Sequence, residues 1–252
     1  GRLVHSQETI PPIPGCDVIL TIDTNLQSVA MESLARNIEL IRNKKENANY
    51  NDACAGAVVA LDVNSGEVLV MASYPSFDPQ IFLKALEDKQ AQQAIVELNN
   101  DKTKPQLNRT IQEIYAPGST FKPLTAIAAL EKGVITPTNN RIYDAGYTNI
   151  GGRDLYCLEK PYYGHGWLNL KSALETSCNI YFYELGVKTT IDTLSHWAGQ
   201  FGLGKKTGID LPSEVSGMMS SIELKKKLRN DIWRPADTAQ VAIGQFDNAF
   251  TP

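Results

Sequence analysis

The sequence has little of several features that mark common classes of protein. It carries only four cysteines among 252 residues, too few and too scattered for a disulfide scaffold. No apolar stretch approaches the roughly 18 residues that span a bilayer. The formal net charge of −4 and the lack of a prominent basic cluster give no indication of nucleic-acid binding. What is present, 42% hydrophobic and 21% charged residues, suffices for the core of one large or two smaller globular domains.

The hydrophobic pattern of the first third predicts both helix and strand. Residues 16–22 favour a strand that ends at Asp-Thr, residues typical of helix caps. Apolar residues recur at helical spacing over residues 26–41 and predict a helix. Residues 56–63 and 67–74 are rich in β-forming side chains and flank Asn-Ser-Gly, so they predict a hairpin.

Further helices are expected in the second half of the chain. One should cover residues 119–130, where the density of apolar residues suggests a buried position. Another should cover residues 171–187. The lysine run 225–227 is short and predicts a solvated helix face. Cys16 and Cys54 have no partner pattern and are expected to be buried apolar residues.

A serine and a lysine three residues apart form the most informative pair. Residues 115–123 read Tyr-Ala-Pro-Gly-Ser-Thr-Phe-Lys-Pro, with Ser119 and Lys122 where a helix is expected to begin. Positions i and i+3 share a helix face, so the two side chains can meet. A serine hydroxyl is a weak nucleophile until a base takes its proton, and burial moves a lysine pKa towards neutrality. The pair predicts a nucleophile with its base, although a capping serine beside a solvated lysine would give the same pattern.

A second polar motif, Ser-Cys-Asn at residues 177–179, follows about 55 residues later. Acyl-transfer sites with the Ser-x-x-Lys signature need a second hydroxyl to pass a proton between the lysine and the leaving group. They also need an amide that holds the lysine and hydrogen-bonds to the substrate. Ser177 and Asn179 can supply both groups from one short turn. The structural alternative is a serine-capped turn with asparagine in the left-handed conformation.

With their flanking segments, these motifs resemble the class B penicillin-binding proteins, the monofunctional D,D-transpeptidases of bacterial peptidoglycan synthesis. The resemblance runs through nearly the whole chain. Residues 20–27 (Leu-Thr-Ile-Asp-Thr-Asn-Leu-Gln) are similar to the opening of the transpeptidase domain, and residues 56–75 to its first hairpin. Gly-His-Gly at 164–166 and Tyr-Phe-Tyr at 181–183 make the chain most similar to the penicillin-binding protein 2 group of the rod-elongation machinery.

The resemblance implies a penicillin-binding/β-lactamase-like α+β fold, an antiparallel five-stranded sheet with helices on both faces. It also implies that Ser119 attacks the D-Ala-D-Ala end of a stem peptide and passes the acyl group to a neighbouring stem, forming a cross-link. Lys122 would be the base, Ser177 the proton relay and Asn179 the residue that positions the substrate. A β-lactam would acylate the same serine, and no cofactor is implied for catalysis.

The same resemblance implies that the sequence is part of a longer chain. Residues 1–15 would be a linker from an upstream pedestal domain and membrane anchor. Residues 16–252 would be a transpeptidase domain that ends before its C-terminal strands and its third motif, Lys-Thr/Ser-Gly. Lys-Thr-Gly at 206–208 spells that motif, but Gly204 and Pro212 flank it and favour a loop over an edge strand, so we interpret it as a decoy. On this interpretation the chain alone would be incomplete and inactive.

Two cysteines, a histidine and an aspartate are candidate metal ligands, and such donors together suit Zn²⁺. The four candidates are Asp144, Cys157, His165 and Cys178. Elongation-type members of the resembled family can carry zinc at matching positions. We therefore expect a structural zinc that ties this loop to the Ser177 motif. A Cys157–Cys178 disulfide, ordinary buried residues, or Asp154 in place of Asp144 remain alternatives.

Two other functions would use the same motifs. A serine β-lactamase shares the Ser-x-x-Lys motif, but no added carboxylate after Asn179 suggests a base for hydrolysing the acyl-enzyme. A non-catalytic penicillin-sensing domain would keep the pocket for signalling. For a transpeptidase, the resemblance implies four partners: peptidoglycan stem peptides, β-lactams, a membrane glycosyltransferase and the scaffold protein of the rod complex. It implies a role in cell elongation and shape at the periplasmic face of the bacterial inner membrane.

Overall fold

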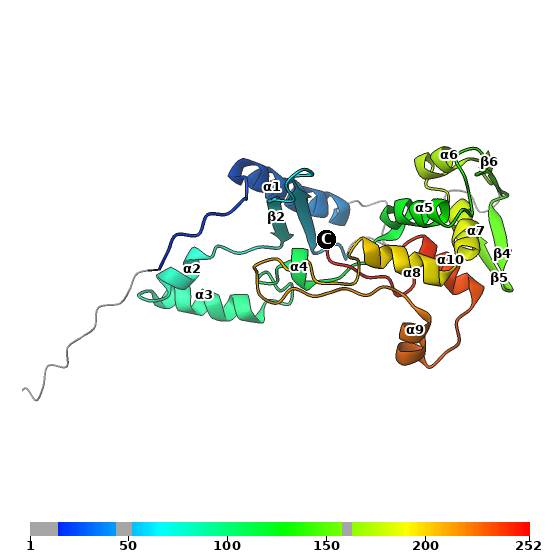
Figure 1. Ribbon diagram of the computed structural model, residues 1–252. Coiled ribbons are helices and arrows are strands. Elements are labelled where there is room, and N and C mark those ends of the chain that lie inside the picture. The colour runs from blue at the N-terminus through cyan, green and yellow to red at the C-terminus, as the bar shows by residue number, and fades with distance from the viewer. Residues whose placement is uncertain (1–14, 44–51, 158–162) are drawn as a thin grey trace, which may run out of the picture.

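The computed structural model describes residues 15–43, 52–157 and 163–252, and helices dominate it (Figure 1). The elements of the first half are α1 (Thr24–Arg42), β1 (Gly56–Leu61), β2 (Val68–Tyr74), α2 (Gln80–Lys84), α3 (Lys89–Asn100), α4 (Arg109–Gln112), η2 (Gly118–Phe121) and α5 (Lys122–Glu131). Those of the second half are β3 (Ile142–Asp144), β4 (Tyr147–Ile150), β5 (Arg153–Tyr156), β6 (Gly166–Leu168), α6 (Leu170–Glu175), α7 (Asn179–Thr189), α8 (Ile191–Gln200), α9 (Ile222–Arg229) and α10 (Pro235–Ala242). Within these described ranges, no helix combines the length and the hydrophobicity that a membrane span requires.

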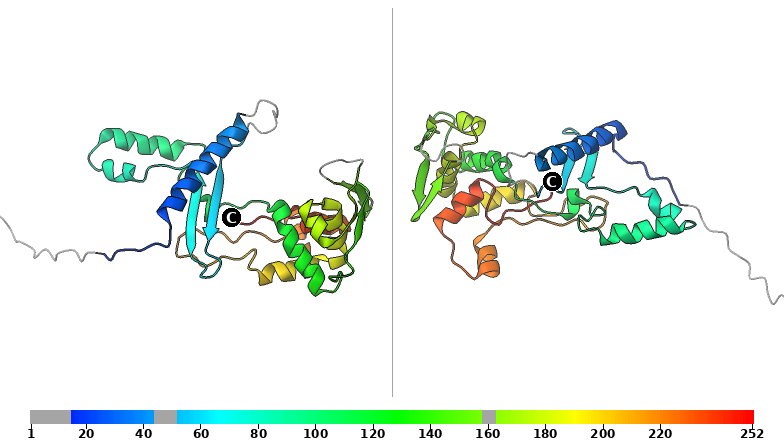
Figure 2. Two further views of the ribbon diagram at one scale, coloured as in Figure 1. Left: turned by 90° about the horizontal axis from the view of Figure 1, so that it is seen from above. Right: turned by 180° about the vertical axis from the view of Figure 1, so that it is seen from behind.

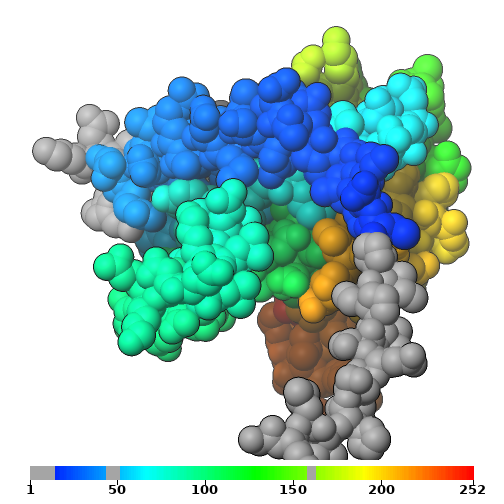
Figure 3. Space-filling view, turned by 90° about the vertical axis from the view of Figure 1, so that its left-hand side faces the viewer, coloured from blue at the N-terminus to red at the C-terminus, as the bar shows by residue number. Residues whose placement is uncertain are grey.

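The elements fall into two neighbouring groups (Figures 1 and 2). Helix α1 and the β1–β2 hairpin lie in one group, with α2 and α3 beside them. Helices α5, α7, α8 and α10 form the other group, and the short strands β3–β6 lie at its far end. Figure 3 looks at the first group, where α1 runs across the top and residues 80–100 lie below it.

The predicted helix and hairpin of the first third are confirmed. Asp23 caps α1 by accepting hydrogen bonds from the backbone N–H groups of Asn25 and Leu26. In the turn between β1 and β2, Gly66 has φ +78°, which glycine adopts without strain. The two strands pair antiparallel, and α1 packs along β2.

The mixture of helices and antiparallel strands confirms the α+β class. The five-stranded sheet belongs to a family domain with its C-terminal strands, and the described residues of this chain form a smaller set of short strands. Their strands make three separate two-stranded antiparallel sheets, β1–β2, β3–β6 and β4–β5. After β2 the chain passes through Pro75 into helices α2 and α3, so it does not return as a strand beside the hairpin. In the described ranges, the edges of the hairpin therefore have no third strand.

The strand predicted at residues 16–22 is wrong, as is the burial of Cys16 and Cys54. The segment is extended but joins no sheet, and Val18, Ile19 and Leu20 are 69–94% exposed. It meets the hairpin only at its end, where Thr21 Oγ1 donates to the Val68 carbonyl at 2.7 Å. Because the rest of the segment does not pair with the edge of the hairpin, its side chains remain in solvent. Both cysteines are exposed.

The buried core lies in the second group of helices, around α7. Ile180, Tyr181, Phe182 and Leu185 of α7 have no exposed surface. Helix α7 packs tightly against α10, because a Cβ on Gly186 would lie 2.2 Å from the Ala242 Cβ. Helix α5 packs on α7 as well. The three helices thus pack together, and the predicted motifs lie at the starts of α5 and α7.

The single helix predicted over residues 171–187 is wrong, because the structure has two helices there with Ser177 between them. Helix α6 ends at Glu175 and α7 begins at Asn179. Between them Ser177 has φ +52°, and the Cys178 N–H donates to the Ala173 carbonyl at 3.0 Å, which closes the end of α6. The helix predicted from Ser119 likewise begins with the 3₁₀ turn η2 before α5 continues it.

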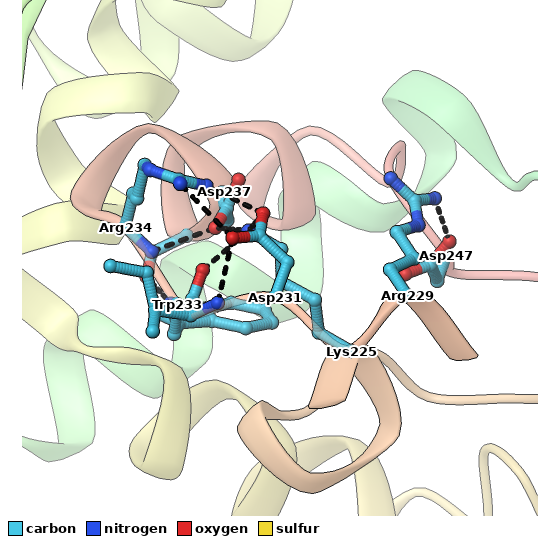
Figure 4. A network of polar contacts seen from close by, with 9 residues as sticks. Lys225, Arg229, Asp231, Trp233, Arg234, Asp237 and Asp247 are labelled. Atoms are coloured by element: carbon cyan, nitrogen blue, oxygen red, sulfur yellow. Dashed lines mark hydrogen bonds and ion pairs between the residues drawn. The ribbon is translucent and has the colours of Figure 1, made fainter. Parts of the chain in front are cut away.

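The solvated helix face predicted for residues 225–227 is wrong for Lys225. This side chain is 3% exposed, and its Nζ donates to Asp237 Oδ2 at 2.7 Å and to the Ile232 carbonyl at 2.6 Å. Asp231 lies 3.0 Å away and also binds Arg234 (Figure 4). The loop after α9 brings Asp231 to the lysine, and the first turn of α10 brings Asp237.

Candidate active site

The candidate nucleophile lies on a tight turn at the start of α5. Residues 118–121 form η2, and α5 follows directly from Lys122. Gly118 has φ +56°, a left-handed conformation that a residue without a Cβ adopts easily. Ser119 is exposed on this turn, whereas Lys122 is 1% exposed. The turn thus directs the hydroxyl outwards and the amine inwards.

The second motif holds the amine. Lys122 Nζ donates to the Ser177 carbonyl oxygen at 2.6 Å, to Ser177 Oγ at 3.0 Å and to Asn179 Oδ1 at 2.7 Å. An ammonium group has three protons, and these three acceptors match them. Nζ also lies 5.5 Å from the centre of the Phe182 ring, a cation–π contact. The buried charge is therefore fully partnered, which makes its burial tolerable.

The hydroxyl of Ser177 connects the lysine to the nucleophile. Ser177 Oγ lies 3.0 Å from Ser119 Oγ, within hydrogen-bonding distance, and 3.0 Å from Lys122 Nζ. The hydrogen-bonded route from the amine to the nucleophile thus passes through this second serine. Its position depends on the break between α6 and α7, because Ser177 occupies the left-handed residue of that break. The structure brings all four predicted residues, Asn179 included, into one site.

Burial changes the acidity of the lysine. It lowers the pKa of Lys122 from its ordinary value of 10.5 to about 8, because the charged form loses hydration, while negative charge on Cys178 and Cys157 acts in the opposite direction. A base with a pKa near the working pH combines an available neutral form with useful basicity. Lys122 therefore suits general-base chemistry in a way that a solvated lysine does not.

The Lys-Thr-Gly sequence at 206–208 lies in a loop, as its interpretation as a decoy requires. The carboxylate of Glu214 accepts hydrogen bonds from the Thr207 N–H and Thr207 Oγ1, both at 2.6 Å, and from the Gly208 N–H at 3.2 Å. The threonine hydroxyl and two backbone N–H groups of this sequence are thus bound to a carboxylate of the same chain.

The four candidate metal ligands gather at one point beside the second motif. Each offers one ligand atom, and these atoms all lie within 4.8 Å of one another. His165 Nδ1 is 2.6 Å from Asp144 Oδ2, and Cys178 Sγ is 3.1 Å from the same oxygen. Cys157 Sγ is 3.8 Å from His165 Nδ1. The cluster directly adjoins the second motif, since Cys178 lies between Ser177 and Asn179.

The alternatives for this cluster can be compared with the structure. Cys157 and Cys178 are free thiols. Asp154 is exposed on β5 and binds Asn149, so Asp144 is the carboxylate that belongs to the cluster. The hydrogen bond between the two thiols lowers the pKa of Cys157 and raises that of Cys178. Two sulfurs, an imidazole and a carboxylate, one of the thiols acidified, are a donor set that fits Zn²⁺.

Two contributors to the site are not predicted from the sequence. Phe182 covers the lysine, but within an aromatic triplet nothing marks it as the residue that does so. Gly244 accepts a backbone hydrogen bond from Gly118 at 3.0 Å. A glycine at the end of a helix signals only a turn, and its contact with a residue 126 positions earlier is visible only in the folded chain.

Comparisons with known proteins agree with this geometry. A family model described as the penicillin binding protein transpeptidase domain matches residues 56–252. The peptidoglycan D,D-transpeptidase MrdA of Escherichia coli (strain K12) is 36% identical over 252 residues, which are 100% of this chain and 36% of that protein. The chain thus spans about a third of the length of this curated relative.

Solved structures are similar over most of the chain. The complex of penicillin-binding protein 2 with MreC from Helicobacter pylori has a TM-score of 0.70 and 34% identity, covering 78% of this chain and 36% of that one. The penicillin G acyl-enzyme complex of penicillin-binding protein A from M. tuberculosis has a TM-score of 0.73 and 28% identity, covering 92% of this chain and 48% of that one.

Proposed function

The chain belongs to the penicillin-binding protein transpeptidase family, and we propose that it acts as a peptidoglycan D,D-transpeptidase with Ser119 as its nucleophile. One observation carries the proposal, the hydrogen-bonded path from Lys122 through Ser177 to Ser119. The relatives support it, since MrdA is a D,D-transpeptidase and the M. tuberculosis protein takes penicillin G as an acyl-enzyme.

Acylation follows from the path. Neutral Lys122 takes a proton from Ser177 Oγ, which takes one from Ser119 Oγ as that oxygen bonds to the carbonyl carbon of the penultimate D-alanine. The backbone N–H of Ser119, at the N-terminal end of η2, is one donor to the oxyanion. The proton returns through Ser177 to the leaving amine, the C–N bond breaks, and D-alanine departs. Asn179 positions the substrate by hydrogen-bonding to its backbone amide.

In the second step of the reaction, transfer of the acyl group to an acceptor amine, these proton transfers run in the opposite direction. An amine from a neighbouring stem peptide attacks the ester at Ser119, gives its proton through the same path and forms the cross-link, which restores the serine hydroxyl. A β-lactam acylates Ser119 in the same way. Its leaving nitrogen stays tethered to the acyl group, so it remains in the site where the acceptor amine must approach.

Two experiments separate this function from its alternatives. Intact mass after incubation with a labelled penicillin should show one adduct on the intact protein and none on Ser119→Ala. A β-lactamase would shed the adduct within seconds to minutes, whereas a transpeptidase or a sensor keeps it. Formation of cross-linked product from stem peptides then distinguishes the transpeptidase from the sensor. Absence of the adduct on the wild-type protein would overturn the acyl-enzyme proposal.

The Asp144 cluster supports a second part of the proposal, a structural Zn²⁺ held by Asp144, Cys157, His165 and Cys178. Ligand atoms around one tetrahedral zinc lie roughly 3.3–3.8 Å apart, and the four atoms here already lie within 4.8 Å of one another, so small side-chain shifts would complete the site. Four protein ligands complete the tetrahedron and leave no position for substrate, so the ion would stabilise the fold. Bound there, it would fix Cys178 and thereby the two catalytic residues beside it.

Metal analysis tests the zinc site directly. Protein purified without added metal should contain one zinc per chain by mass spectrometry. Cys157→Ser should lose it, whereas Cys54→Ser, at an exposed cysteine, should keep it. A zinc-free protein that is two mass units lighter than its reduced form would instead indicate a Cys157–Cys178 disulfide.

The relatives also support proposals for place and partners. The solved complex with MreC supports a rod-complex scaffold as partner, and the family supports peptidoglycan stem peptides and β-lactams as ligands. We place the protein at the periplasmic face of the inner membrane, beside a membrane glycosyltransferase. Cross-linking in living cells, followed by identification of the joined peptides, tests this arrangement.

A further inference from the structure

The turn that follows α10 touches the segment that carries the nucleophile. The carbonyl oxygen of Gly244 accepts a hydrogen bond from the Gly118 N–H at 3.0 Å. Nearby, Thr125 Oγ1 of α5 donates to the Ala242 carbonyl at 2.8 Å, in a buried contact. These two hydrogen bonds join α5 and its N-terminal turn to the end of α10.

Gly244 leaves no room for a side chain at this contact. Its φ is +72°, and a Cβ built there would lie 2.2 Å from the Gly118 carbonyl oxygen, 2.7 Å from Phe121 Cβ and 2.8 Å from the Gly118 nitrogen. Two of these atoms are backbone atoms of the residue next to Ser119. The third belongs to a side chain that is 3% exposed. None of them can rotate away, so a side chain at 244 must push the turn itself.

We propose that Gly244 is a positioning residue for the nucleophile. Its bare backbone lets Gly244 bind Gly118 directly, and this contact sets where the Ser119 hydroxyl lies relative to Ser177. The inference rests on the proposed acylation of Ser119. Gly244 itself touches neither substrate nor reacting atoms and acts through Gly118.

The far side of the turn is anchored, so the turn cannot simply move back. Phe246, a non-glycine residue with φ +69°, has its ring 4.6 Å from the Arg229 guanidinium carbon and 5.7 Å from Lys225 Nζ. Trp233 meets the same ring edge-to-face at 5.5 Å. The network drawn in Figure 4 holds both cations in place, with Arg229 paired to Asp247. The turn is thus fixed between α9 and the nucleophile.

The size of the displacement follows from the contact distances. Real Cβ atoms essentially never approach closer than 3.0 Å, so the Cβ and the Gly118 oxygen would have to separate by at least 0.8 Å from 2.2 Å. Ser119, one residue along, would move with Gly118. A misplacement of about 1 Å in an active site can cost about 100-fold in rate. Gly244→Ala should therefore lower the acylation rate constant by about 10- to 100-fold.

The test measures the two steps of acylation separately, by stopped flow with a fluorescent penicillin over a range of concentrations. For Gly244→Ala we expect the limiting acylation rate constant to fall by about 10- to 100-fold. The dissociation constant of the non-covalent penicillin complex that precedes acylation should change less than about threefold. Gly133→Ala is the matched control, because Gly133 also has a positive φ, +73°, but open space at its Cβ. It should keep the wild-type acylation rate within about twofold.

The outcomes are distinguishable. A folded Gly244→Ala variant with the wild-type limiting rate would overturn the positioning role. If that variant does not fold, Phe246→Leu tests the role instead. It weakens the packing of residue 246 against Arg229 and Trp233 and leaves the glycine at 244 unchanged. It should slow the same step about 3- to 10-fold, and an unchanged limiting rate would refute the role. If wild-type protein forms no Ser119 adduct, the proposed function fails first, and the role of Gly244 with it.

Discussion

The acidity of Lys122 gives the sharpest test of the proposed base. In Asn179→Asp the side chain keeps its shape but places a carboxylate where the amide oxygen now accepts from Nζ at 2.7 Å. An opposite charge this close favours the ammonium form and raises a lysine pKa by roughly 1–3 units. Because the base must be neutral to accept a proton, acylation should become slower at neutral pH.

The expected fall in the acylation rate follows from the pKa of Lys122 in the wild type. With a pKa of about 8, about a quarter of Lys122 is neutral at pH 7.5. Each unit of upward shift lowers that fraction roughly tenfold, so penicillin acylation at pH 7.5 should fall about 10- to 1,000-fold. The acylation rate of the wild type should rise with pH and level off above about 8. The variant should level off at correspondingly higher pH, so the two rates should converge as the pH increases.

The assay is the acylation rate constant from pH 6 to 9.5 for both proteins. Asn64→Asp, in the exposed β1–β2 turn, adds the same charge far from the amine and should leave the profile unchanged. If Asn179→Asp lowers the rate equally at every pH, the reasoning about the base is refuted. The amide would then act on the substrate alone, and the lysine would not be the titrating base.

Three other perturbations have defined outcomes. Ser177→Ala removes the hydroxyl between Lys122 Nζ and Ser119 Oγ, and acylation at pH 8 should fall by about 10²- to 10⁴-fold with little change in thermal stability. Lys225→Met leaves Asp237 without its cation and should lower the free energy of unfolding, measured in urea, by about 2 kcal/mol. This is less than for a fully buried ion pair, because the network borders solvent. A decrease below about 0.5 kcal/mol would contradict this. A chelator should lower the melting temperature of the wild type and leave that of Cys157→Ser unchanged, and equal shifts in both would count against the zinc site.

The sequence predicts those parts of the molecule whose causes are local. The cap and stripe of α1, the Asn-Ser-Gly turn and the spacing of Ser119 and Lys122 all act within a few residues, so pattern is enough. The break before α7 is different, because apolar residues continue at helical spacing from Ala173 past Ile180 and conceal it. The burial of Lys225 is also hidden from the sequence pattern, but for a different reason. Its carboxylate partner Asp237 lies 12 residues further on and meets it only after α10 has docked.

Each of the two motifs is also anchored by residues outside it. On one side, the bare backbone of Gly244 binds the residue before Ser119. On the other side, Cys178 ties the Ser177 turn to the Asp144 cluster. Lys122 lies between them, with its three protons directed to the second motif. A proton path of two 3.0 Å steps tolerates little relative motion of its supports, because a hydrogen bond weakens steeply once its geometry is lost. The residues that set the acylation rate should therefore include some that never meet the substrate. Substitutions at Gly244 and in the Asp144 cluster should both slow acylation.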